Sequence, residues 1–133
     1  MCLILRNPNK KWIKKLKLDS KVVCWKVVHQ QSRGKYSSPF WWTGNYSPGR
    51  IVQSNRMSTK ITKEETRSER INLGIHVFLY RSAARDLQES CKRSFEPRVY
   101  RVIKVEVDVN DFVACNSQEA AFTKVKVIGK GKA

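Results

Sequence analysis

The segment that most constrains the fold is a short apolar run that changes directly into a helical pattern. Residues 74–80, Gly-Ile-His-Val-Phe-Leu-Tyr, are rich in β-branched and aromatic side chains, which is typical of a buried strand. Apolar residues then recur three and four positions apart from Ala84 to Cys91, and this spacing predicts a helix over about 82–94. Because Ser82 stands at the start of that pattern, we expect its side chain to cap the helix.

Several other segments predict β-strands. Residues 21–30 form an almost continuous apolar run, which is typical of a central strand covered on both faces. Residues 98–109 alternate between apolar and polar side chains, and period two over that length predicts a strand with one buried face. Shorter runs predict strands at residues 36–42, 51–52, 112–115 and 121–128. The predicted fold class is therefore α+β: one compact domain over residues 1–133, with a mostly antiparallel sheet and one main helix.

The first twenty residues predict a short basic helix. A turn at residues 7–9 precedes a segment in which Trp12, Ile13 and Leu16 share one helical face and lysines occupy the other. The first 35 residues contain ten Lys and Arg but one acidic residue, Asp19. Such a segment can bind nucleic acid or an acidic partner while its apolar side packs onto the domain, because long lysines can cover a packed element and still present charge.

Three further segments are candidates for contact with partners. Residues 53–72 form a polar connection that is long for a compact domain, and we expect an exposed loop with a helical turn around 63–70. Residues 129–133 form a basic tail. Aromatic residues cluster at 36–46, where they could stack on single-stranded bases but more often pack a loop or a protein interface.

The strongest compositional signal is charge. The chain of 133 residues has 27 Lys and Arg against 11 Asp and Glu, for a net charge of +16. So basic a chain is attracted to polyanions, namely nucleic acid, an anionic membrane face or an acidic protein. We expect such a partner to contact the N-terminal helix, the aromatic cluster and the tail. The predicted contact residues are Lys10, Lys11, Trp12, Lys14, Lys15, Lys17, Trp41, Trp42, Lys130 and Lys132.

The sequence shows none of the common motifs of catalytic or metal sites. Its four cysteines form no Cys-x-x-Cys pair, so a structural zinc site has little support, and Cys24 and Cys91 fit buried thiols. His29 and His76 both lie in apolar strands, where a histidine is more often a hydrogen-bonded core residue than a catalyst. We therefore predict no metal, no cofactor and no catalytic residue, which leans against an enzyme.

Localisation is expected from the absence of two further signals. No apolar run approaches the length of a membrane span, and no signal peptide is visible. We therefore expect the protein in a host cell interior or in a virion, and not among secreted proteins.

Three short motifs together carry a resemblance. They are Met1-Cys2-Leu3, the strand Val-Cys-Trp-Lys-Val-Val at residues 23–28 with Ser-Pro at 38–39, and Gly-Ile-His-Val-Phe at 74–78 with Ala-Ala at 83–84. The chain resembles small uncharacterised proteins of phages, large DNA viruses and some bacteria. The resemblance implies a compact α+β fold and a viral setting, and it implies no activity.

A second, weaker likeness is to the ADP-ribosyltransferase fold. In that fold an early strand ends at a polar catalytic position, and a later Gly-aliphatic-aromatic strand leads into a helix with an alanine. His29 would hold the early position, and Tyr80 and Glu119 are the plausible occupants of the two remaining catalytic positions. This likeness rests on analogy between folds alone.

The favoured function is non-enzymatic. We expect a strongly basic structural or interaction protein, a minor component of a virus particle that contacts neighbouring proteins or acidic surfaces. One alternative is a sequence-independent nucleic-acid-binding protein, in which the lysines of residues 10–17 neutralise phosphates. The other is an ADP-ribosyltransferase-like enzyme. The charge pattern alone leaves open whether the partner is nucleic acid or protein.

Overall fold

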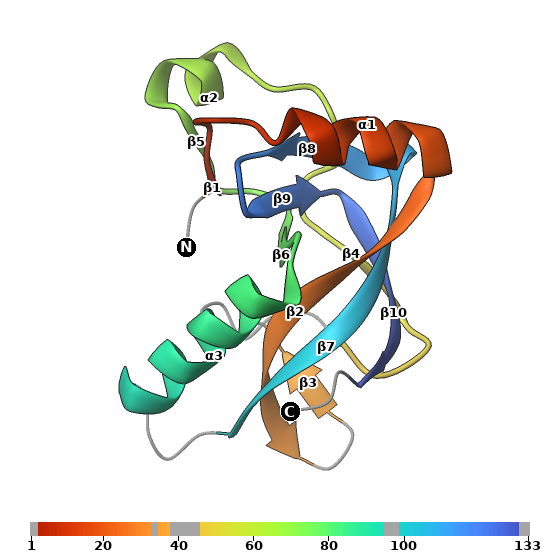
Figure 1. The fold of residues 1–133 in the computed structure, drawn as a ribbon, viewed down its shortest axis with the longest axis vertical. Coiled ribbons are helices and arrows are strands. Elements are labelled where there is room, and N and C mark those ends of the chain that lie inside the picture. Colours follow the sequence, from red (N-terminus) through yellow and green to blue (C-terminus); the bar gives the residue numbers. More distant parts are fainter. Residues whose placement is uncertain (1–2, 33–34, 38–45, 95–98, 131–133) are drawn as a thin grey trace.

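A curled antiparallel β-sheet forms the centre of the protein. The structure is a computed structural model that describes residues 3–32, 35–37, 46–94 and 99–130. The main sheet has the strand order β4-β10-β7-β2-β6-β9-β8, with β3 paired to one end of β2, and β1 and β5 form a separate two-stranded ribbon (Figure 1). The strands are β1 Leu3–Ile4, β2 Lys21–Ser32, β3 Lys35–Ser37, β4 Ile51–Gln53, β5 Arg70–Ile71, β6 Ile75–Phe78, β7 Val99–Asp108, β8 Phe112–Cys115, β9 Glu119–Phe122 and β10 Lys124–Lys130.

Three α-helices accompany the sheet, and every strand pair among the described residues is antiparallel. The predicted α+β class, with a largely antiparallel sheet, one main helix and a short basic N-terminal helix, is therefore confirmed. The helices are α1 Lys10–Asp19, α2 Lys63–Ser68 and α3 Arg81–Ser94, with a 3-10 turn η1 at Val109–Asp111.

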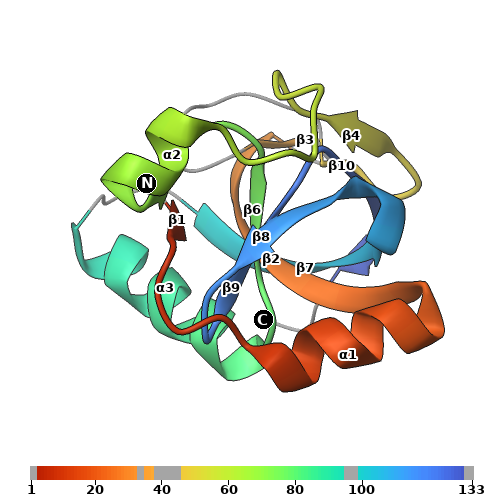
Figure 2. The same ribbon diagram turned by 90° about the horizontal axis from the view of Figure 1, so that it is seen from above.

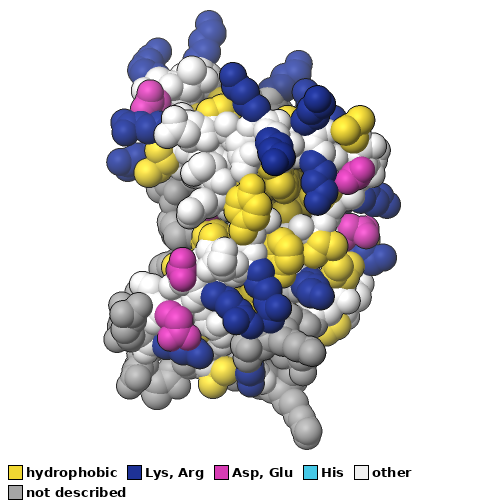
Figure 3. All heavy atoms as spheres, in the orientation of Figure 1, with side chains coloured by type: hydrophobic (Ala, Val, Ile, Leu, Met, Phe, Trp, Pro, Cys, Tyr) yellow, Lys and Arg dark blue, Asp and Glu magenta, His cyan; other side chains and the backbone are white. Residues whose placement is uncertain are grey.

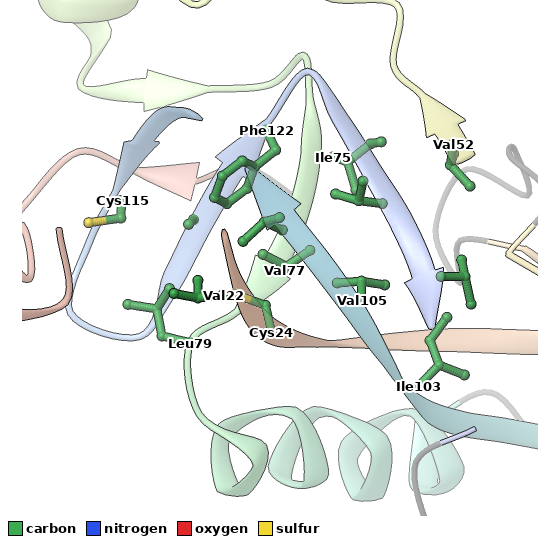
Figure 4. Close-up of a cluster of buried hydrophobic side chains, with 14 of the residues drawn as sticks. Val22, Cys24, Val52, Ile75, Val77, Leu79, Ile103, Val105, Cys115 and Phe122 are labelled. Atoms are coloured by element: carbon green, nitrogen blue, oxygen red, sulfur yellow. The ribbon is translucent and has the colours of Figure 1, made fainter. Parts of the chain in front are cut away.

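The concave, inner face of the sheet holds the largest hydrophobic cluster. Viewed from above, the strands curl around this face, and α1 lies across one end of it (Figure 2). Strands far apart in the chain contribute to the cluster, because alternate residues of each strand point to the same face (Figure 4). The core residues drawn and labelled in Figure 4 are Val22, Cys24, Val52, Ile75, Val77, Leu79, Ile103, Val105, Cys115 and Phe122.

Two elements cover parts of the convex, outer face. Helix α3 packs its small residues Ala83 and Ala84 against Tyr100 and Val102 of β7, and the side chain of Gln88 donates a 2.9 Å hydrogen bond to the Tyr100 carbonyl. The β1–β5 ribbon packs on β8 and β9 at the other end of the sheet. Because of this cover, the first half of β7 buries its outer-face residues Tyr100 and Val102. The rest of the strand buries inner-face residues from Ile103 onward, so the buried face changes along a strand for which the alternation predicted one buried face.

Helix α1 is fixed to the domain by aromatic packing. The Trp12 ring lies 6.2 Å from Phe112 and 6.3 Å from Phe122, and these two phenylalanine rings lie 5.6 Å apart. Asn9 caps the helix, because its side-chain oxygen accepts a 3.0 Å hydrogen bond from the Trp12 amide. The Asn9 amide group also donates to the Tyr80 hydroxyl at 2.9 Å, which ties the helix start to the segment before α3.

The predicted main helix is confirmed, but its predicted cap is wrong. The Ala84 amide donates a hydrogen bond to the Tyr80 carbonyl, so the helix begins at Arg81 and Ser82 lies exposed within the first turn. Just before this unit, Gly74 adopts a φ of 116°, and a Cβ there would lie 3.4 Å from the Phe122 carbonyl oxygen. A glycine is therefore required at the start of β6.

Two other predicted segments differ in the structure. The single strand expected at 121–128 is two strands, β9 and β10, which separate at Thr123 because β9 pairs with β6 and β8 whereas β10 pairs with β7 and β4. The polar connection 53–72 contains α2, within the helical turn expected at 63–70, and ends in β5. Residues 38–42 of the strand expected at 36–42 lie outside the described residues.

We expect Trp12→Ala to lower the free energy of unfolding by about 3–5 kcal/mol, because truncation of a buried aromatic side chain leaves a cavity. The matched control is Leu18→Ala in the same helix. Since the Leu18 side chain is 75% exposed, this control should change stability by less than about 0.5 kcal/mol. Urea denaturation followed by circular dichroism measures both. Equal losses in the two variants would contradict the anchoring role of Trp12.

Candidate functional site

The exposed side of α1 carries a continuous set of lysines, which we call the lysine face: Lys10, Lys11, Lys14, Lys15 and Lys17, all exposed. At 3.6 residues per turn these five side chains span an arc of about 160° on one side of the helix. Trp12 and Leu16 lie on the opposite side and are buried. Figure 3 shows Lys and Arg side chains gathered over α1 at the upper right of the surface.

Most of the lysine face is electrostatically unfavourable for the helix that bears it, the exception being Lys17 in the last turn, where the helix dipole favours a cation. The first turn of α1 has no acidic residue and begins with two lysines, although the helix dipole favours negative charge there. Lys10 and Lys14, and Lys11 and Lys15, stand four residues apart, where like charges repel by about 0.2–0.5 kcal/mol per pair. None of the ion pairs found among the described residues includes an α1 lysine. The charges of the lysine face are thus exposed and not neutralised by an ion pair within the described part of the chain.

Trp12 is the predicted contact residue that the structure places elsewhere. Its side chain is only 7% exposed and packs on two phenylalanines, so it is not available to a partner. The apolar spacing with Leu16 was the correct signal, and it indicated the buried side of the helix. Trp12 therefore positions the lysine face and does not belong to it.

The side chains of the other predicted contact residues lie outside the described part of the chain. Trp41, Trp42 and Lys132 are outside the described residues. Lys130 is the last residue of β10, and its side chain is likewise not described. The structure therefore brings together the five lysines of α1. Whether Trp41, Trp42, Lys130 and Lys132 lie near them is outside what the described residues show.

A buried lysine that was not among the predicted site residues lies on the inner face of the sheet. Strand β2 pairs with β6 only at Trp25 and Phe78, so the two strands diverge beyond that point. Lys26 lies in this gap, 7% exposed, and its Nζ donates a 2.9 Å hydrogen bond to the His76 carbonyl. The ammonium also lies 5.3 Å from the centroid of the Tyr46 ring. The only sequence signal was one lysine at an inward position of the apolar run 21–30.

Lys26, His76 and Glu119 form an electrostatically linked group. Burial lowers the pKa of Lys26 to about 8, against the opposing effect of Glu119. Burial raises the pKa of the Glu119 carboxyl, and Lys26 opposes that shift. Burial, with a further contribution from the Lys26 charge, lowers the pKa of His76 to about 4, so its imidazole is neutral at pH 7. His76 and Glu119 are near neighbours, because β6 and β9 pair His76 with Ala121 and Phe78 with Glu119.

The three residues named for an ADP-ribosyltransferase site do not assemble. His29 is four residues beyond the Trp25–Phe78 pair in one direction along the sheet, and Tyr80 is two residues beyond it in the other. At 3.3 Å per residue that places them about 20 Å apart along the strands. His29 is buried with its ring 5.7 Å from Tyr100, whereas Tyr80 is exposed and accepts a hydrogen bond from Asn9. The described residues thus hold no pocket built from this triad.

Metal sites and membrane helices were also sought within the described ranges. No group of three or more His, Cys, Asp or Glu residues there is placed to hold a metal ion. None of the helices in that part of the chain combines the length and apolar character needed to cross a membrane.

Comparison with known proteins does not assign this chain to a family. No family model, no curated protein and no solved structure matches this chain. Its function must therefore be inferred from the geometry of the chain itself.

The low pKa of His76 predicts a loss of stability in mild acid. Between pH 6.5 and 4 the unfolded chain binds a proton at this residue and the folded chain does not, so stability falls as pH falls through this window. At pH 5 the loss is about 2 kcal/mol relative to pH 7. We expect His76→Gln to lose this part of the pH dependence. Urea titrations of both proteins at the two pH values test this, and an equal acid sensitivity would contradict it.

Proposed function

We propose that the protein is a non-enzymatic interaction protein that binds a polyanionic surface through the lysine face of α1. The observation that carries the proposal is the set of five exposed lysines, none ion-paired among the described residues, which repel one another and put cations at the start of the helix, where the dipole disfavours them. The resemblance to phage and virus proteins suggests the setting, a minor component of a particle. The partner is then an acidic surface of a neighbouring protein.

Nucleic acid is the second candidate, because five exposed lysines can neutralise phosphates. Apart from the exposed Leu18, the arc offers Lys alone, without the Arg, Asn or Gln that read base edges by bidentate hydrogen bonds. Lysine acts as a point charge toward phosphate. Trp12, the aromatic residue of α1, is buried, so base stacking on this helix is excluded. Any contact of this face with nucleic acid is therefore independent of base sequence.

A binding experiment with two probes tests both candidates. We expect the protein to bind a labelled poly-glutamate peptide, a labelled duplex DNA or both at low salt. The triple variant Lys10→Gln, Lys14→Gln, Lys17→Gln removes one row of the lysine face and should weaken that binding at least tenfold. For DNA, the slope of log affinity against log salt should become shallower by about 0.9 for each phosphate that the variant no longer neutralises. Fluorescence anisotropy across a salt series provides both measurements.

The matched control removes the same charge elsewhere. Lys60→Gln, Lys63→Gln, Arg67→Gln changes three exposed cations at and before α2 and leaves α1 intact. Equal loss of binding in the two triple variants would show that only net charge matters, and would contradict a site on α1. Failure of the wild-type protein to bind either probe at low salt would remove the proposal altogether.

A further inference from the structure

The loop that follows β4 buries a charged side chain and exposes the apolar side chain next to it. Arg56, at the centre of the loop, is 7% exposed, whereas the next residue, Met57, is 78% exposed. Usually the arginine is exposed and the methionine is buried, because burial of a cation costs free energy unless it is hydrogen-bonded, whereas burial of an apolar side chain is favourable. The loop therefore holds a fixed shape that displays Met57.

Hydrogen bonds to Arg56 fix that shape. Its Nε donates to the Ser58 carbonyl at 2.7 Å, and one terminal nitrogen donates to the Lys60 carbonyl at 2.7 Å. Both terminal nitrogens donate to the Glu65 carboxylate, so the chain from residue 56 to 60 is wrapped around one guanidinium group. These hydrogen bonds compensate the burial of the guanidinium group, and they order the loop in the unbound protein.

Glu65 connects the loop to α2. Its carboxylate accepts a 3.0 Å hydrogen bond from the Thr62 amide, and the Thr62 hydroxyl accepts one from the Glu65 amide, which together form a capping box. The hydrogen bonds from Arg56 lower the pKa of Glu65 to about 2. The carboxylate therefore stays charged at every physiological pH, and the loop keeps its geometry.

Met57 lies beside an uncovered part of the outer face of the sheet. The Gln53 amide group contacts the Met57 sulfur at 3.8 Å, and Ile51, two residues before Gln53 on the same face of β4, is 63% exposed. Across the strand pair, Lys124 stands opposite Gln53 and Lys126 opposite Ile51, and both lysines are exposed. We call this surface the Met57 patch: Ile51, Gln53, Met57, Lys124 and Lys126.

We propose that the Met57 patch docks an acidic segment of another protein, with Met57 and Ile51 entering apolar positions of that segment and Lys124 and Lys126 pairing with its carboxylates. Two exposed apolar side chains beside two cations match a segment that mixes apolar and acidic residues. Methionine suits such a contact because its flexible side chain adapts to irregular surfaces. The patch lies outside α1, so this proposal is independent of the lysine face.

Other occupants fit the patch less well. A second copy of this chain would bring two molecules of charge +16 together across a basic patch, which electrostatic repulsion opposes. Nucleic acid gains affinity from cations and from stacking aromatics, and the patch offers no aromatic ring for its bases. A membrane surface can take apolar and basic side chains together, and the experiment below includes it as a contradicting outcome.

The chain offers a specific probe for this surface, because it contains only two methionines, Met1 and Met57. Full-length protein labelled with ¹³C at the methionine methyl groups gives at most two signals, which Met57→Leu assigns. A peptide ligand is obtained by display of random peptides on the immobilised wild-type protein. We expect the selected peptides to combine Asp or Glu with Leu, Ile or Phe, and a synthetic copy to shift the Met57 methyl signal.

Two matched variants give the proposal its decisive comparison. Ile51→Ser with Met57→Ser should weaken peptide binding at least tenfold. Ile4→Ser with Leu18→Ser also removes two exposed apolar side chains, away from the patch, and should leave peptide affinity within twofold of wild type. Thermal melting of both variants verifies that they are folded.

Several results would overturn the proposal. They include a selection that yields no acidic and apolar peptide, a peptide that leaves the Met57 signal unmoved, and equal binding by the two double variants. A Met57 signal that changes with protein concentration alone would identify a second copy as the occupant. A response to vesicles of phosphatidylcholine and phosphatidylserine, but not to peptide, would identify a membrane.

Discussion

The burial of Trp12 against Phe112 and Phe122 is the contact on which the proposed function depends. It attaches a ten-residue helix to the end of the curled sheet and fixes which side of that helix meets water. A helix of this length is marginal on its own, so tertiary packing must stabilise it. Only because the aromatic side is buried do five lysines face outward together. The hydrophobic core thus determines where the charge of the chain is displayed.

Among the residues that the structure describes, two buried cations are exceptions to that outward display, and both have a structural role. Lys26 fills the gap where β2 and β6 diverge and satisfies the His76 carbonyl. Arg56 orders the loop after β4 through two carbonyls and the Glu65 carboxylate. Each is almost fully buried, and each is compensated by hydrogen bonds. A basic composition therefore does not mean that every basic residue is available to a partner.

The sequence predicted the elements whose signal is local. The alternation in residues 98–109 and the helical spacing from Ala84 to Cys91 each repeat within one segment, and β7 and α3 are present where expected. The division between β9 and β10 was missed because it depends on which distant strands the chain pairs with. The prediction of Ser82 as the cap was wrong because the turn after β6 brings the Tyr80 carbonyl within hydrogen-bond distance of the Ala84 amide, so the helix begins before Ser82.

For the candidate sites, too, the sequence predicted what depends on a local signal and missed what depends on contacts made only in the folded chain. Five lysines of the lysine face were predicted, since amphipathic spacing in one helix is a local signal. Trp12 was also named as a contact residue, although its spacing with Leu16 placed it on the apolar side of the helix, which is the side that the structure buries. Arg56 and Met57 could not be distinguished in sequence from an ordinary polar loop. Their reversed exposure arises from carbonyl groups that only the folded loop brings around the guanidinium.

The central claim is that the lysine face reduces the stability of its own helix and is retained for contact with a partner. The most direct test is the free energy of unfolding of Lys10→Gln, Lys14→Gln, Lys17→Gln relative to wild type, measured at low and at high salt without any partner. We expect the variant to be the more stable protein at low salt, by about 1 kcal/mol, because repulsion among the lysines is relieved and Lys10 no longer opposes the helix dipole, and these gains outweigh the loss of Lys17 from the last turn, where the dipole favours a cation. This difference should shrink at high salt, where charges are screened. A variant that is less stable than wild type at low salt would contradict the claim.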